Sequence, residues 1–100
     1  MAINDRSVDI LQPDVLWAGG ITAGVKICHM AEAAGVSIIA HAGMNYPYGQ
    51  HLSFALPGVP LDEMSLLPGT PAIKDGYLIP SDAPGFGLEV DLDWLNQVAV

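Results

Sequence analysis

Residues 36–42 read VSIIAHA, a run of small and apolar residues that ends in His41 and a further alanine. A strand with one face in water alternates apolar and polar residues, whereas a continuous apolar run is typical of strands buried on both faces. Such strands belong to parallel sheets that helices cover. The stretch therefore predicts a strand of a parallel sheet with a histidine at its carboxyl end.

The residues before this strand predict a strand–helix–strand unit. Residues 8–11 form a short apolar run that Pro13 closes, which favours a strand. Residues 21–35 predict a helix, with Thr22 as its cap and Gly35 at its left-handed end. Four apolar or small side chains recur there at helical spacing: Ile21, Val25, Cys28 and Ala31. Two strands joined by one helix make a parallel βαβ unit with a right-handed crossover.

The residues after His41 predict two more secondary-structure elements, followed by a region of different composition. Residues 48–58 favour a short helix, and residues 60–67 a third strand. From residue 68 on, prolines and glycines are frequent, with turns expected at Asp75–Gly76 and Pro84–Gly85 and no helix before Asp91. We therefore divide the chain into an α/β segment over residues 1–67 and a tail with short strands over residues 68–100.

Composition narrows the classes of function. Eleven acidic residues against three basic ones give a formal net charge of −8, which disfavours binding to nucleic acid or to anionic membrane surfaces. The sequence has no apolar stretch of membrane-spanning length and no signal-peptide pattern, so we expect a cytoplasmic protein. Cys28 is the single cysteine, which excludes an internal disulfide. Hydrophobic residues make up 51% of the chain and charged ones 14%, which suggests that more protein covers part of its surface.

Asp14 and His41 are the strongest candidates for chemistry, because each follows a predicted parallel strand. Ligands and catalytic groups of α/β proteins gather at the carboxyl ends of such strands, and adjacent strands lie about 4.8 Å apart. A carboxylate there would fix the tautomer of the imidazole, favour the imidazolium and make the histidine a general acid or base. In the alternative interpretation, Asp14 is a turn residue after Pro13 and His41 a hydrogen-bonded core histidine.

Other polar and aromatic residues are weaker candidates. Glu63 follows the start of the third predicted strand, although Asp-Glu pairs are usually solvated surface residues. The loop and helix after His41 carry possible substrate-binding side chains, which more often only pack or face solvent: Asn45, Tyr46, Tyr48 and His51. His41 and His51 without a defined third ligand make a poor metal motif, so we predict no metal site in the chain.

Three motifs together resemble a known family. DILQPDVLWAGGIT at residues 9–22, IIAHAG at residues 38–43 and APGFGLEVD at residues 83–91 resemble the C-terminal part of the enolase superfamily. Within the mandelate racemase and muconate lactonizing enzyme branch, the acid-sugar dehydratases such as L-rhamnonate dehydratase look most similar. The resemblance implies the last three strands or so of a (β/α)8 barrel, followed by an irregular tail.

The resemblance also implies roles for three residues. Asp14 and His41 match the Asp and His at the ends of the sixth and seventh barrel strands, which form the catalytic dyad of that branch. Glu63 is the best match to a glutamate at the end of the eighth strand that hydrogen-bonds the substrate carboxylate or the enolate. The family chemistry removes the proton next to the carboxylate of a sugar acid with the help of Mg²⁺. The strands that supply the metal ligands have no counterpart in this sequence.

Three hypotheses follow. The chain is a C-terminal segment of an acid-sugar dehydratase that is inactive alone, or it is one subunit of a split enzyme that another chain completes. In the third, it is a non-catalytic module that docks on a full-length homologue through its apolar surface. Which sugar acid is bound, and whether the reaction is dehydration or racemisation, depends on parts outside this sequence.

Overall fold

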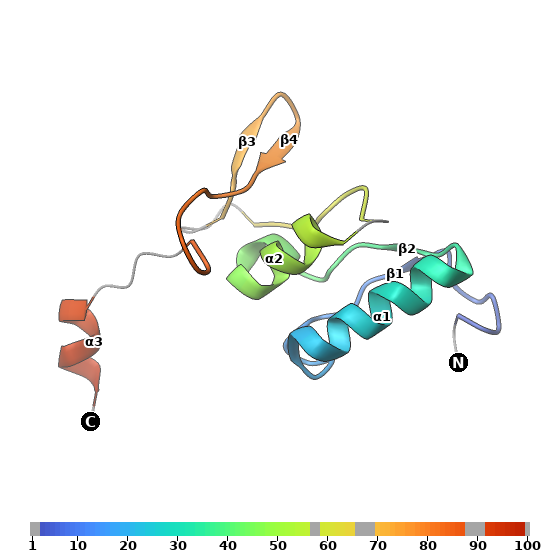
Figure 1. Ribbon diagram of the computed structural model, residues 1–100, viewed down its shortest axis with the longest axis horizontal. Helices are drawn as coiled ribbons and strands as arrows, with labels where there is room; N and C mark the ends of the chain where they lie inside the picture. Colours follow the sequence, from blue (N-terminus) through green and yellow to red (C-terminus); the bar gives the residue numbers. More distant parts are fainter. Residues whose placement is uncertain (1–2, 57–58, 66–69, 88–91, 100) are drawn as a thin grey trace.

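The computed structural model describes residues 3–56, 59–65, 70–87 and 92–99. Its elements follow one another along the chain as two short strands with a helix between them, two further helical turns, a hairpin and a terminal helix (Figure 1). Their bounds are β1 Ile10–Leu11, α1 Gly20–Ala34, β2 Ser37–Ile38, the 3₁₀ turn η1 Gly43–Asn45, α2 Pro47–Ala55, β3 Ala72–Lys74, β4 Tyr77–Ile79 and α3 Leu92–Val98.

The predicted βαβ unit is confirmed. β1 and β2 are parallel neighbours, with Ile10 opposite Ser37 and Leu11 opposite Ile38. Both strands are shorter than the apolar runs that predicted them. Hydrogen bonds from the N–H of Ile39 to the carbonyl of Leu11, and from His41 to Pro13, continue the pairing toward the carboxyl ends at 3.0 Å each.

Glycines set both ends of α1. The helix begins after Gly19, which has a φ of 102° and no side-chain cap, so the prediction that Thr22 caps it is wrong. Gly35 ends it in the left-handed conformation at φ 70°, as predicted. The N–H groups of Gly35 and Val36 bond the carbonyls of Glu32 and Ala31, which is the Schellman arrangement that satisfies the last turn.

The core lies where α1 and α2 pack beside the strand pair. Its cluster of buried side chains consists of Val15, Cys28, Ala31, Ile38 and Leu52. At Gly24 of α1, an added Cβ would come within 3.1 Å of a Leu52 methyl group, so the missing side chain lets α2 approach closely. A further close approach joins η1 and α2, because a Cβ at Gly49 would overlap the carbonyl group of Gly43.

Residues 59–65 run as extended chain and form no strand, so the third strand predicted over residues 60–67 is not observed in its described part. One backbone hydrogen bond, from the N–H of Met44 to the carbonyl of Glu63 at 3.1 Å, holds this segment to η1. A strand is recognised by a ladder of pairs with a neighbour. Within the described ranges, only one bond of such a ladder is present here.

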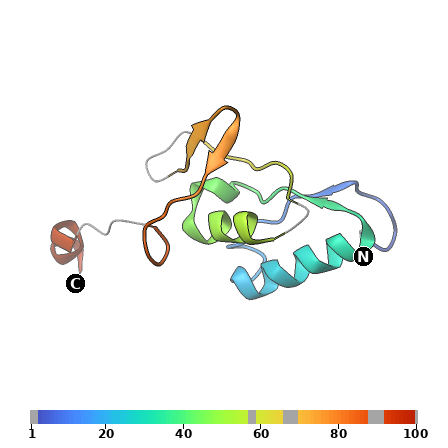
Figure 2. The ribbon, with the colours of Figure 1, turned by 45° about the horizontal axis from the view of Figure 1, so that its top comes forward.

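The tail contains the two predicted turns. β3 and β4 form an antiparallel hairpin with Lys74 opposite Tyr77, and the two residues between them both have positive φ, 52° at Asp75 and 83° at Gly76. Positive φ at both positions is the type I′ pattern that fits the twist of a hairpin. Gly85, with a φ of 66°, lies in the second turn. α3 lies apart from the other elements in both views (Figure 1 and Figure 2).

In the part of the chain that the structure describes, no helix combines the length and the apolar character needed to cross a membrane.

Candidate active site

Strand pairing brings Asp14 and His41 together. The last backbone bond between the two strands joins His41 to Pro13, so the side chains that follow emerge at the same edge. Oδ2 of Asp14 lies 3.3 Å from Nδ1 of His41 across a sequence separation of 27 residues. The juxtaposition expected from the two strand ends is therefore present.

The Asp14 carboxylate is fixed by its own turn. Its Oδ1 accepts hydrogen bonds from the N–H groups of Leu16 at 2.8 Å and Trp17 at 3.2 Å, which leaves Oδ2 facing His41. Desolvation raises the pKa of this carboxyl, but the hydrogen bonds from Trp17, His41 and Leu16 outweigh it, so that the pKa lies below its ordinary value. Asp14 is therefore an anion near neutral pH and an oriented acceptor for the imidazole.

His41 presents an open ring. Its side chain is 57% exposed against 24% for that of Asp14, so the alternative of a buried core histidine is wrong. When Nδ1 carries the proton that it donates to Asp14, the lone pair of Nε2 is free to take a proton from a ligand. The pair can thus act as an oriented general acid or base.

Glu63 reaches the same edge from the extended segment. Its Oε2 accepts hydrogen bonds from the N–H of Ala42 at 2.8 Å and from Nε2 of Gln12 at 3.4 Å. Ala42 directly follows His41, and Gln12 precedes Asp14 by two residues. Gln12 was missed by the sequence interpretation, and its only signal was its place beside Pro13 at the same strand end.

The four weaker candidates lie in or next to η1 and α2. Oδ1 of Asn45 accepts the N–H of Ser65 at 2.8 Å, which ties the loop to the extended segment. Tyr46 and Tyr48 stack with ring centroids 5.9 Å apart, and Tyr48 also packs against the hydrophobic core. His51 meets the ring of Phe86 edge-on at 5.4 Å. No hydrogen bond or ring contact joins these four to the Asp14–His41 pair within the described residues.

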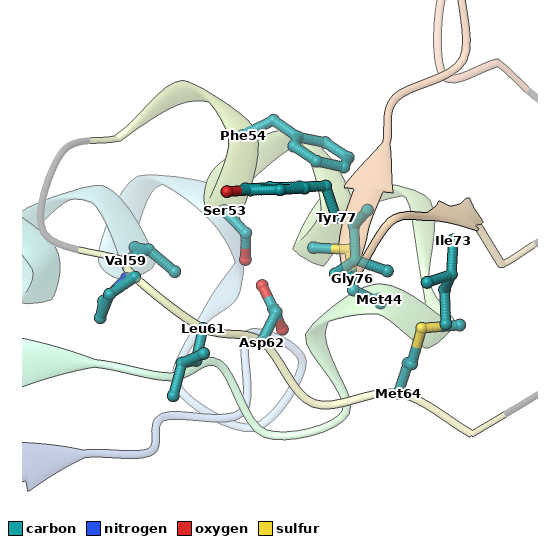
Figure 3. A pocket seen from close by; sticks show the side chains of 12 residues that line it. Met44, Ser53, Phe54, Val59, Leu61, Asp62, Met64, Ile73, Gly76 and Tyr77 are labelled. Atoms are coloured by element: carbon teal, nitrogen blue, oxygen red, sulfur yellow. The ribbon is translucent and has the colours of Figure 1, made fainter.

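A pocket of about 350 Å³ lies between α2, residues 59–64 and the β3–β4 hairpin (Figure 3). Neither the Asp14–His41 pair nor Glu63 lines it. Asp62 and Ser53 point toward each other in its wall (Figure 3). Burial raises the pKa of the Asp62 carboxyl above its ordinary value, and interactions with the Ser53 hydroxyl and the N–H of Glu63 offset this only in part.

The described residues do not fit a metal site. They contain no group of three or more histidine, cysteine, aspartate or glutamate side chains that could hold a metal ion together. A hard cation such as Mg²⁺ needs near-octahedral oxygen ligands, which the Asp14–His41 pair with Glu63 nearby does not supply.

Residues 1–94 match the family model described as "Enolase C-terminal domain-like", and the chain belongs to this family. The predicted α/β class and the resemblance to the enolase superfamily are thereby confirmed, with a TIM-barrel-type domain as the parent fold. The chain is 33% identical over 103 residues to a D-galactonate dehydratase family member of Enterococcus gallinarum, covering 89% of this chain and 26% of the relative. It is 32% identical over 101 residues to a putative L-rhamnonate dehydratase of Caldivirga maquilingensis, covering 88% and 25%.

A solved structure has the same fold. An enolase from Pantoea ananatis, crystallised with D-gluconate and Mg, superposes with a TM-score of 0.80 at 23% identity, over 96% of this chain and 26% of that one. The chain spans about a quarter of the length of the curated relatives that it matches.

Proposed function

We propose that this chain supplies the proton-transfer half of an acid-sugar dehydratase active site. The observation that carries the proposal is the 3.3 Å approach of Asp14 Oδ2 to His41 Nδ1 at the carboxyl ends of two neighbouring parallel strands. The similarity to proteins named as galactonate and rhamnonate dehydratases supports a sugar acid as the substrate.

His41 is the group that moves the proton. Its Nε2 takes the proton from the carbon next to the substrate carboxylate, or gives a proton to the β-hydroxyl as that group leaves as water. Asp14 holds the ring and stabilises the positive charge that the ring gains. Glu63 in its protonated form donates a hydrogen bond to the substrate carboxylate, so that the carbon to be deprotonated stays within reach of His41.

The metal is the part of this chemistry that the described residues do not provide. The Pantoea ananatis structure contains Mg, which stabilises negative charge on a substrate carboxylate when bound, but no group among the described residues fits it. We therefore assign no step of this chain to the metal. The proposal places the metal ligands and the remaining strands outside the described residues.

Barrel geometry supports this division of the site. A (β/α)8 barrel closes with eight strands and about 250 residues, and closure removes every free edge. Here β1 and β2 form a two-stranded sheet within the described ranges. We therefore expect these 100 residues to be inactive alone and active only when the remaining strands and the metal ligands are supplied.

The test is a complementation assay. The chain is co-purified with a polypeptide carrying the first five barrel strands and the capping domain of an acid-sugar dehydratase, and aldonate dehydration is measured with Mg²⁺. We expect turnover by the pair, none by either part, and a loss of about 10²- to 10⁴-fold for His41→Asn. His29→Asn, at an exposed position on α1, is the matched control and keeps the activity. Turnover by the isolated chain, or full activity of His41→Asn, contradicts the proposal.

The exposed apolar surface favours a second candidate function, a module that docks on a full-length homologue. Trp17 is 89% exposed, Leu61 67% and Ile10 51%, which is unusual for large apolar side chains on an independent domain. The same assay separates the two. A complex that forms equally well with His41→Asn and shows no dehydration with either variant supports the module.

A further inference from the structure

Glu63 receives two hydrogen bonds on one oxygen. The N–H of Ala42 and the side-chain amide of Gln12 both donate to Oε2, at 2.8 and 3.4 Å. Oε1 accepts no hydrogen bond from the described residues. The two donors flank the Asp14–His41 pair along the chain, so the same two strand ends that build the pair also orient Glu63.

The backbone of Glu63 is held as well. Its N–H donates to Oδ1 of Asp62 at 2.8 Å, and its carbonyl accepts the N–H of Met44 at 3.1 Å. Oδ2 of Asp62 is buried. The Asp62 carboxylate points toward Ser53 of α2 (Figure 3). Both ends of the Glu63 side chain are therefore anchored, which makes its orientation a property of the fold.

Ala42 adopts a conformation that favours glycine. Its φ is 48°, in the left-handed region, where a residue with a Cβ is disfavoured. Such conformations persist when surrounding contacts over-determine them and are concentrated at functional sites. Here the short hydrogen bond to Glu63 is the contact that the conformation serves.

We infer that Gln12 is a positioning residue for Glu63. Together with the Ala42 N–H it occupies Oε2, so that Oε1 is the oxygen that Glu63 presents to a ligand. N–H groups only donate, and a proton placed on Oε2 would point at two donors. A protonated Glu63 therefore carries its proton on Oε1. The assignment of the oxygen rests on hydrogen-bond geometry alone, and the ligand's identity rests on the proposed function.

The test uses nuclear magnetic resonance on the full chain. We expect the chemical shifts of the Gln12 side-chain amide protons and of the Ala42 amide proton to change together on acidification. Their pH midpoint should equal that of the chemical shift of the Glu63 carboxyl carbon. Glu63→Gln abolishes both responses. Gln12→Leu retains the Ala42 response, while the three-bond couplings of the Glu63 side chain change from the values of one rotamer toward averaged values.

Gln50→Leu is the matched control, because Gln50 donates to the carbonyl of Met44 at 2.9 Å and not to Glu63. It leaves the Glu63 couplings unaltered. Gln12→Asn keeps an amide but shortens the side chain by one methylene, and it has the same expected result as Gln12→Leu, so a folding defect of the leucine variant does not decide the test. The inference is overturned if the chemical shifts of the Gln12 amide protons do not change as Glu63 is protonated. It is also overturned if the three-bond couplings of the Glu63 side chain are unchanged in both Gln12 variants.

A kinetic measurement separates this inference from the proposed function. In the complementation assay, Gln12→Leu lowers kcat by about tenfold to a hundredfold through misplacement of Glu63. If the chemical shifts and couplings behave as expected but no dehydration occurs, the positioning role of Gln12 stands and the proposed dehydratase function is contradicted. Dehydration that Gln12→Leu and Gln12→Asn both leave at the original rate counts against the positioning role.

Discussion

Two aspartates near the site have carboxyl pKa values displaced in opposite directions. Hydrogen bonds from backbone N–H groups and His41 lower the pKa of Asp14, whereas burial raises the pKa of Asp62. A carboxyl whose pKa is lowered in the folded state stabilises the fold at pH values above the ordinary aspartate pKa. A carboxyl whose pKa is raised stabilises the fold at pH values below it. The fold thus keeps Asp14 charged beside the histidine and penalises charge on Asp62 inside the pocket wall.

Replacing Asp62 tests this penalty. The contribution of Asp62 is present at acidic pH and is lost as the pH rises through its raised pKa, so Asp62→Asn should stabilise the fold at pH 7 and lose this advantage below the ordinary aspartate range. Asparagine keeps the acceptor for the Glu63 N–H. Amide protection factors along α2 at several pH values measure the effect. Asp82→Asn, at an exposed position, is the control, and a pH-independent advantage of Asp62→Asn contradicts the prediction.

At the level of elements, the contact between η1 and α2 controls the loop after His41. A Cβ at Gly49 would overlap the backbone of Gly43, which cannot move without displacing its neighbour Ala42. Gly49→Ala should therefore cost about 1–3 kcal/mol, as overpacking does, and shift the amide resonances of residues 42–45. His51→Ala on the same helix, at an exposed position, should leave those resonances in place. Unmoved loop resonances in Gly49→Ala would contradict this account.

The sequence predicted the βαβ unit from local patterns, and the Asp14–His41 pair followed from the parallel pairing of the two strands in that unit. The apolar run before His41, the helical spacing of α1 and the stop at Gly35 all act within a few residues of one another. Asp14 and His41 are 27 residues apart, but a βαβ unit places the ends of its two strands side by side, so their approach could be predicted. The hydrogen bonds of Glu63 to Gln12 and Ala42 start from residues 59–65, which form no strand, so no pairing rule places them. The third strand failed for a related reason, because a strand needs a partner whose pairing no local pattern encodes.

At the level of the whole molecule, the chain is expanded and has a small core. Its radius of gyration is 15.3 Å, against about 13 Å for a compact domain of 100 residues. Seven hydrophobic residues are buried among the described ones, while Trp17, Leu61 and Leu92 are more than 60% exposed. A core of this size leaves little net stability once conformational entropy is counted.

The isolated chain should consequently unfold over a broad temperature range, and a complementing chain should raise and sharpen the transition. Binding to the folded state alone stabilises it by mass action, by about 2.7 kcal/mol when the partner is present at a hundred times its Kd. Calorimetry of the chain with increasing partner measures the shift. A sharp unfolding transition of the isolated chain, at a temperature that does not change when the partner is added, would contradict this expectation.

The arrangement of Asp14 and His41 within a single βαβ unit has a consequence for how such barrels change over time. Because the 28 residues from Asp14 to His41 carry both groups and the hydrogen bonds that orient Asp14, a single gene segment can carry the whole pair. Recombination with both break points outside this βαβ unit leaves the pair intact. An oriented Asp–His pair can in this way pass between otherwise different scaffolds, with the rest of each site supplied by the recipient.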